Sequence, residues 1–403
     1  MREKFNIYKI LFICIISFNF LVSCTYISNS NEKTTKYIFK KISVSNLSIY
    51  DNGNETQLIK AINESVNYLS NHPKKIFLFN KQKFTSNKLK TSLINLKYLI
   101  KQKHSISIKD LTKYFNIYTL SKKETIWDYI IDLIFHKNEN KNKVLITGYF
   151  EPELIASYKK DKEFSYPIYE RPSDLIQVYL PLFDKSLPHE TIWGRVYKGQ
   201  LIPYFTRKEI EERIKNGNIN AKPIAWLRSP IDLLVLQIQG SAILDINGTK
   251  RFIHYAASNG RPYISIGMIL LNKGILPYSK LSWQDIEKWA KKNPKRFSEI
   301  LEKNPRYIFF KWEDRGPLGS IGLPLIPMRT IAMDQSIYPP ILITLIVFKK
   351  GLKNFNLITL NFDQGAAIKG FKRIDLYCGE GKKAETLAGS LRAYGKIYFL
   401  IPK

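Results

Sequence analysis

The chain has 403 residues, of which 44% are hydrophobic, so it can form a core and is not disordered as a whole. Its formal charge of +29 is spread along the chain rather than gathered in one basic stripe, which argues against a nucleic-acid-binding protein. The length predicts two or three domains, or one domain that carries a large insertion.

The N-terminal segment predicts export. Basic residues open the chain, and the apolar run that follows, residues 10–22, is too short for a comfortable membrane span. Leu21-Val-Ser-Cys24 is similar to a bacterial lipobox, in which the cysteine is lipidated after cleavage. We therefore expect a signal peptide over residues 1–23 and a lipid anchor at Cys24, with an ordinary signal peptide as the alternative. By resemblance to lipoproteins, Thr25 in place of Asp favours the outer membrane.

Polar residues dominate the next segment, residues 24–55, which we interpret as a tether with one short strand near residues 37–42. Apolar residues then repeat at helical spacing in three places, which predicts helices over 58–69, 89–100 and 126–134.

The pattern becomes β-rich at residues 144–150. We expect further strands at 233–238 and 251–256, with a turn at Asn247-Gly248, and a helix that begins at Ser282. Apolar runs at 341–349, 357–362 and 397–401 predict strands near the C-terminus. This order indicates two domains and a β-barrel that is built from split segments.

Neither a metal site nor a disulfide is expected within the folded part of the chain. The five histidines show no metal-binding spacing, and Cys378 is the one cysteine outside the N-terminal segment. No organic cofactor is implied either.

The segment Arg373-Ile-Asp-Leu-Tyr-Cys-Gly379 is the leading candidate for chemistry. Strand alternation places Asp375 on one face with Arg373 and Tyr377, while the residues between them point into a core. Partial desolvation beside an aromatic ring would raise the pKa of this aspartate, as a general acid at neutral pH requires. On this pattern alone, an ordinary aspartate on an exposed strand is the commoner explanation.

Several short motifs occur in the order found in one family. They are Thr147-Gly-Tyr-Phe-Glu-Pro152, Phe164-Ser-Tyr-Pro-Ile-Tyr169, Pro203-Tyr-Phe-Thr-Arg207, Ile238-Gln-Gly-Ser241, Asn259-Gly260 followed by Ile266-Gly267, and Arg329 to Asp334. With them, residues 144–403 resemble the MltA family of membrane-bound lytic murein transglycosylases, including its C-terminal 3D domain. Two positions depart from the family pattern, because Ala242 and Ala366 stand where the family usually has glycine.

The resemblance implies a mainly β fold with α-helices and two domains. A double-psi β-barrel-like catalytic domain, residues 56–155 and 300–403, is split by an inserted second β-barrel domain, residues 156–299, with a groove between them. It also implies a location in the cell envelope, facing the periplasm, with peptidoglycan glycan strands as the partner.

The activity implied is non-hydrolytic cleavage of the β-1,4 bond between N-acetylmuramic acid and N-acetylglucosamine, which forms 1,6-anhydromuramic acid ends. Asp375 takes the position of the family's catalytic aspartate and acts as acid and then as base. The remaining candidates are two supporting aspartates and five substrate-binding residues: Asp363, Asp334, Tyr149, Gln239, Ser241, Lys369 and Tyr377.

Two other functions stay open at this stage. A two-carboxylate hydrolase that uses Asp363 and Asp375 would leave reducing ends instead of anhydro ends. A peptidoglycan-binding lipoprotein without catalytic activity is the second alternative.

Overall fold

The computed structural model describes residues 37–103, 105–123, 142–188 and 190–403. The expected signal peptide, Cys24, the first part of the tether and the expected helix at 126–134 lie outside these residues. None of the helices within the described ranges is long and apolar enough to cross a membrane.

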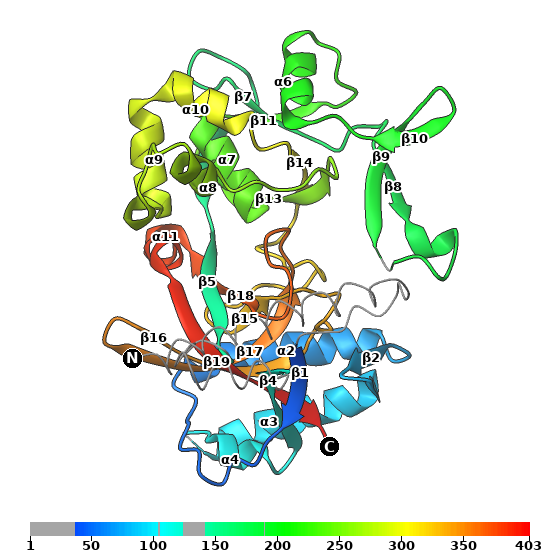
Figure 1. Cartoon of the computed structure of the whole chain (residues 1–403), viewed down its shortest axis with the longest axis vertical. Coiled ribbons are helices and arrows are strands. Elements are labelled where there is room, and N and C mark those ends of the chain that lie inside the picture. The colour runs from blue at the N-terminus through cyan, green and yellow to red at the C-terminus, as the bar shows by residue number, and fades with distance from the viewer. Residues whose placement is uncertain (1–36, 104, 124–141, 189) are drawn as a thin grey trace, which may run out of the picture.

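The largest sheet has eight strands and forms the lower part of the molecule in Figure 1. Its strands are β1 (Tyr37–Lys41), β4 (Phe115–Lys122), β5 (Val144–Glu151), β15 (Thr330–Ala332), β16 (Ile343–Lys350), β17 (Lys353–Asp363), β18 (Arg373–Glu380) and β19 (Arg392–Pro402). They are ordered β1-β4-β19-β16-β17-β15-β18-β5, and β19 also pairs with β5. This additional pairing closes a barrel from β5, β18, β15, β17, β16 and β19.

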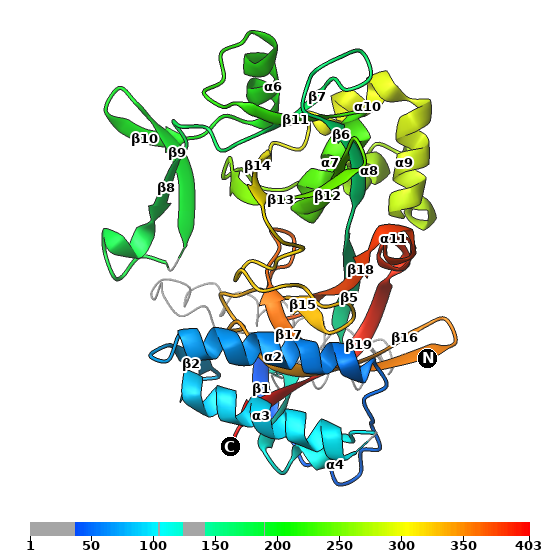
Figure 2. The same ribbon diagram turned by 180° about the vertical axis from the view of Figure 1, so that it is seen from behind.

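Helices cover the outside of this barrel domain (Figures 1 and 2). They are α2 (Glu55–Asn71), α3 (Ser86–Gln102), the short α4 (Ile108–Leu111) and α11 (Gly381–Ser390), and the hairpin β2 (Ile76–Phe79)–β3 (Gln82–Thr85) joins α2 to α3. The two helices expected from their spacing are confirmed as α2 and α3. Asn54 and Thr85 cap their N-termini by accepting backbone N–H groups.

A second domain is inserted between β5 and β15 and lies above the barrel in Figure 1. Its six-stranded sheet, ordered β14-β13-β12-β6-β11-β7, curls until its edge strands β14 and β7 come into contact. These strands are β6 (Glu153–Ser157), β7 (Tyr166–Tyr169), β11 (Pro223–Leu227), β12 (Ser241–Ile246), β13 (Thr249–Ser258) and β14 (Ile308–Glu313). The expected fold class, mainly β with helices and two barrel-like units, is confirmed.

The inserted domain also contains helices and a projecting sheet. The helices are α6 (Arg207–Lys215), α7 (Pro230–Gln239), α8 (Ile266–Asn272), α9 (Trp283–Lys292) and α10 (Pro294–Leu301). A separate three-stranded sheet of β8 (Ile176–Tyr179), β9 (Thr191–Tyr197) and β10 (Gln200–Pro203) stands to one side in both views (Figures 1 and 2).

Three expectations need correction. The strand expected at 233–238 lies inside α7, where Ser229 caps the N-terminus and Pro230 occupies the first turn. The inserted domain begins with β6 at Glu153 and its sheet ends with β14 at Glu313, so the expected boundaries at 155/156 and 299/300 are displaced. The short strand expected near residues 37–42 is confirmed as β1, and its pairing with β4 makes this part of the expected tether a strand of the barrel domain's sheet.

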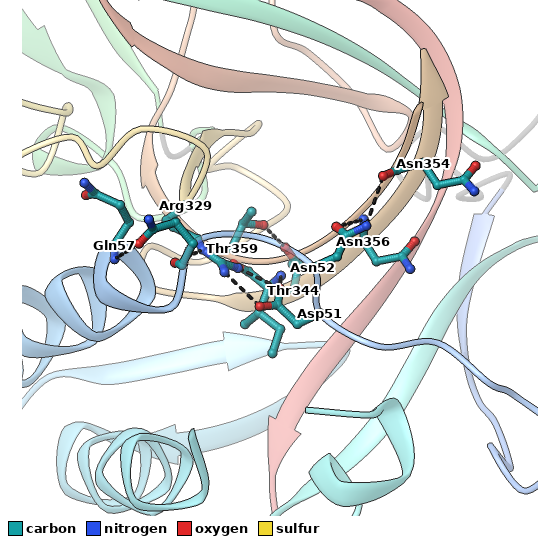
Figure 3. Close-up of polar contacts among 10 residues, drawn as sticks. Asp51, Asn52, Gln57, Arg329, Thr344, Asn354, Asn356 and Thr359 are labelled. Atoms are coloured by element: carbon teal, nitrogen blue, oxygen red, sulfur yellow. Dashed lines mark hydrogen bonds and ion pairs between the residues drawn. The ribbon is translucent and has the colours of Figure 1, made fainter. Parts of the chain in front are cut away.

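One buried ion pair joins distant segments of the barrel domain (Figure 3). The Arg329 guanidinium, 0% exposed, donates to both carboxylate oxygens of Asp51 at 2.7 and 2.8 Å. It also donates to the backbone carbonyl oxygens of Asn54, before α2, and of Ile358, in β17. Gly53 packs against it, because a Cβ there would lie 2.7 Å from the guanidinium carbon. Arg329 therefore ties the N-terminal segment to β15 and β17.

We predict that Asp51→Ala lowers the free energy of unfolding by about 3–5 kcal/mol, because the buried Arg329 charge loses its counterion. Urea unfolding followed by circular dichroism measures this difference. Glu299→Ala, at an exposed position of α10, serves as the control and is expected to change stability by less than about 0.5 kcal/mol. Equal stability of the two variants would contradict the structural importance of the pair.

Candidate functional site

Asp375 lies in the middle of β18, between β15 and β5. Its register partners are Ala332 on the antiparallel side and Thr147 on the parallel side. The Thr147 hydroxyl donates a hydrogen bond of 2.6 Å to Oδ1 of Asp375. The two residues are 228 positions apart in the chain, so the strand pairing brings them together.

The surroundings of Asp375 favour its protonated form. Burial raises the pKa of Asp375 to about 6, although the Thr147 hydrogen bond and the Arg373 charge act in the opposite direction. The negative charge of Asp363 adds to the rise. A carboxyl group with this pKa exchanges its proton near neutral pH, as an acid–base catalyst must.

Asp363 lies at the end of β17 and is held by backbone groups. Its Oδ1 accepts hydrogen bonds from the backbone N–H groups of Ser320 at 2.9 Å and Gln364 at 2.8 Å. Burial raises its pKa, whereas these two N–H groups and the neighbouring Tyr149 hydroxyl oppose the rise. Asp363 thus holds the turn that follows β17, and its negative charge raises the pKa of Asp375.

Tyr149 and Tyr377 sit opposite each other on β5 and β18, with ring centroids 5.3 Å apart. Tyr149 is half-buried, and its pKa is raised well above the usual value by burial and then by the charges of Asp363 and Asp375. Tyr377 was expected to bind substrate, but its side chain is 0% exposed and belongs to the barrel core. It supports the Tyr149 ring and has no surface to offer a glycan.

Asp334 and Lys369 form a separate cluster. Asp334 accepts hydrogen bonds from Gly370 N at 2.8 Å and from the Ser336 hydroxyl at 2.7 Å, and Lys369 Nζ lies 3.7 Å away. Burial would raise the pKa of Asp334, but these hydrogen bonds and the Lys369 charge lower it below its usual value. The expected substrate-binding Lys369 is thus paired with Asp334, and Asp334 fixes the loop before β18.

Gln239 and Ser241 approach β5 from the inserted domain. Gln239 Oε1 accepts a hydrogen bond of 3.2 Å from the Phe150 N–H. The Ser241 hydroxyl lies 2.6 Å from Oε2 of Glu151 and is only 7% exposed as a residue. Both residues therefore lie where the two domains meet, but the Ser241 hydroxyl contacts Glu151 instead of facing open solvent as a glycan-binding group would.

Sequence reasoning missed two residues of this site, Thr147 and Glu151. Both lie on β5 at even spacing from Tyr149, so strand alternation could have placed them on the same face. The local sequence pattern does not predict that β5 pairs with β18, and this pairing places Thr147 beside Asp375.

A cavity of about 360 Å³ lies elsewhere on the barrel domain, between the β16–β17 hairpin and α11. Met328, Lys350, Lys353, Phe355 and Leu387 line it, and none of the candidate site residues takes part. The position of the candidate site therefore follows from side-chain chemistry and not from cavity size. Within the described residues, no group of three or more His, Cys, Asp or Glu side chains is arranged to hold a metal ion.

Two family models match consecutive parts of the chain. The MltA specific insert domain matches residues 145–311, and the 3D domain matches residues 329–401. The chain belongs to the MltA family of lytic murein transglycosylases. Asp334, Asp363 and Asp375 all fall within the 3D domain, and Gln239 and Ser241 fall within the insert domain.

Individual relatives agree with this assignment. Membrane-bound lytic murein transglycosylase A of Vibrio cholerae is 30% identical over 274 residues, which span 65% of this chain and 66% of that protein. The crystal structure of a membrane-bound lytic murein transglycosylase from Agrobacterium tumefaciens matches with a TM-score of 0.70 at 25% identity, covering 90% of this chain and 97% of its own. Escherichia coli MltA with bound chitohexaose matches with a TM-score of 0.67 at 22% identity, covering 93% and 98%.

The two departures from the family pattern lie in different surroundings. Ala242 is 0% exposed within β12, so its extra methyl group packs in the core of the insert domain. Ala366 is exposed in the turn that follows Asp363.

We predict that Thr147→Val raises the pKa of Asp375 above about 6. In the wild type, the Thr147 hydrogen bond stabilises the charged carboxylate, and the variant removes this stabilisation. Carbon NMR titration of labelled aspartate carboxyls, assigned with Asp375→Asn, measures the shift. Thr119→Val, on strand β4, is the control and should not change the pKa of Asp375. An unchanged Asp375 pKa in Thr147→Val would contradict the proposed effect of the hydrogen bond.

Proposed function

We propose that this chain cleaves the β-1,4 bond between N-acetylmuramic acid and N-acetylglucosamine without water and leaves 1,6-anhydromuramic acid ends. Family membership supports the lytic transglycosylase class. The observation that carries the proposal is the environment of Asp375, a partly exposed carboxyl group with a pKa raised to about 6 and a fixed orientation. The chitohexaose bound to E. coli MltA supports a glycan chain as the ligand.

Asp375 acts as the acid in the first step. Its proton passes to the glycosidic oxygen while the bond from that oxygen to C1 of N-acetylmuramic acid breaks. The Thr147 hydroxyl orients the carboxyl group from the β5 side. Because burial favours the protonated form, part of the Asp375 population carries this proton at neutral pH.

The same residue acts as the base in the second step. The 6-hydroxyl of the muramic acid attacks C1 and transfers its proton to the Asp375 carboxylate, which restores the acid. The sugar supplies its own nucleophile, so the second carboxylate of an ordinary glycosidase is not required. Asp363 then supports the site through its charge and through the turn that it holds. Tyr149 lies close enough to Asp375 for the Asp375 charge to raise the pKa of Tyr149, and Gln239 binds the backbone N–H of the next residue, Phe150.

The location follows from the same relatives. Their names describe membrane-bound enzymes, which supports a place in the cell envelope. We propose that lipidation of Cys24 anchors this chain to the outer membrane, with the body in the periplasm. The tether that precedes β1 then connects the anchor to the barrel domain.

We predict that Asp375→Asn lowers the rate of anhydro product release from purified murein by roughly a hundredfold to ten-thousandfold, the usual contribution of acid–base catalysis. Mass analysis of the released sugars measures it, and binding to murein should persist. Asp314→Asn, an exposed aspartate after β14, is the control with normal activity. Reducing ends as the main wild-type product would instead indicate a hydrolase that uses Asp363 and Asp375.

We predict that palmitate labels the wild-type protein and the Cys14→Ala variant but not Cys24→Ala. Membrane fractionation of the same cells should place Cys24→Ala in the soluble fraction. Labelling of Cys24→Ala at the wild-type level would contradict an anchor at this residue.

A further inference from the structure

Glu151 is a buried acid at the point where the chain passes from the barrel to the inserted domain. It ends β5, Pro152 follows it, and β6 begins at Glu153. Its residue is only 2% exposed. Strand alternation places its side chain on the same face of β5 as those of Thr147 and Tyr149, which surround Asp375.

Two consecutive residues of β5 bind one turn of the inserted domain. Glu151 contacts the Ser241 hydroxyl at 2.6 Å, and the Phe150 N–H donates to Gln239 at 3.2 Å. Gly240, with a φ of +86°, ends α7 between these two partners and turns the chain into β12. The turn is therefore fixed to β5 on both sides of a single glycine.

The strand ladder is irregular at the same level. The pairing of β5 with β18 shifts its register between Tyr377 and Glu380, next to Gly379, which has a φ of +110°. Side chains of the inserted domain therefore bind the end of β5 at the level where its regular pairing with β18 is interrupted.

The charges that face Glu151 are mostly negative. Glu380 of β18 and Asp363 of β17 both raise its pKa, and the Tyr377 hydroxyl of β18 is also close. Lys250 of β13 opposes the rise in the pKa of Glu380 and forms an ion pair with Glu153. Burial, opposed by the Ser241 hydrogen bond, raises the pKa of Glu151 to about 8, so it carries a proton at neutral pH.

We propose that Glu151 is a positioning residue: its hydrogen bond to Ser241 fixes the Gln239–Ser241 turn against β5 and so sets Tyr149 and Thr147 relative to Asp375. The inference rests on the proposed function, because it concerns the geometry of that same site. Glu151 acts through the strand that carries Thr147 and takes no part in bond cleavage.

Four variants test this role at pH 6. Glu151→Gln keeps a neutral hydrogen-bonding side chain and should retain kcat/KM within about twofold. Glu151→Ala and Ser241→Ala remove one partner each and should lower kcat/KM about tenfold, the effect of one lost hydrogen bond between buried groups. The double variant should lose no more than either single variant, because the two changes remove the same contact. Glu153→Gln, the exposed next acid, is the matched control.

A loss of activity in folded Glu151→Gln as large as in Glu151→Ala would overturn the proposal, because it would assign chemistry to the carboxyl group itself. Full activity of Ser241→Ala would overturn it as well.

Stability against pH gives a second measurement that needs no activity. Because burial raises the pKa of Glu151 from 4.5 to about 8, its stabilising contribution is complete below pH 4.5 and is lost as the pH rises through about 8. We predict that the melting temperature of the wild type falls relative to that of Glu151→Gln between pH 5 and pH 9. If the melting temperatures of the wild type and Glu151→Gln changed equally with pH, the proposed contact of a protonated Glu151 would be overturned. A wild type that releases no anhydro products would contradict only the proposed function.

Discussion

The barrel domain depends on the burial of one charge. Arg329 has no exposed surface, and a guanidinium ion in that position is tolerable only if its hydrogen-bond donors are satisfied. Asp51 supplies two acceptors and main-chain carbonyl oxygens supply others, and Figure 3 shows how these partners converge from the segment before α2 and from β17. Arg329 directly precedes β15, the strand that pairs with both β17 and β18. The ion pair therefore selects one arrangement of the strands around Asp375.

The three aspartates of the 3D domain show how surroundings divide one chemical group into different roles. Asp334 receives several hydrogen bonds and a nearby lysine, so it stays charged and holds a loop. Asp375 receives one hydroxyl hydrogen bond against a larger effect of burial, so it holds its proton more tightly. Asp363 lies between these cases, because backbone N–H groups bind it while burial still raises its pKa. The balance of hydrogen bonds and burial separates the roles.

Much of the local structure followed from periodicity, whereas contacts between distant segments did not. Helical spacing identified α2 and α3, and alternation placed Ile374 and Leu376 in the core. The strand predicted for Leu233–Ile238 is wrong because a short apolar run fits a buried helix equally well, and the Ser229 cap favours the helix. The roles of Thr147, Glu151 and Ser241 depend on strand pairing and on the domain contact, which no local pattern encodes. Tyr377 followed the expected alternation, but core packing covers its face as well.

The insertion between β5 and β15 also determines the order in which the protein can fold. The sheet of the inserted domain uses only segments between residues 153 and 313, so it can form as soon as that stretch has been made. The barrel can close only later, because β5 pairs with β18 and β19, which lie more than two hundred residues further along the chain. Contacts of such long sequence separation form slowly. Until β19 has formed, β4 and β5 each have an unpaired edge, at which they can mispair with other chains.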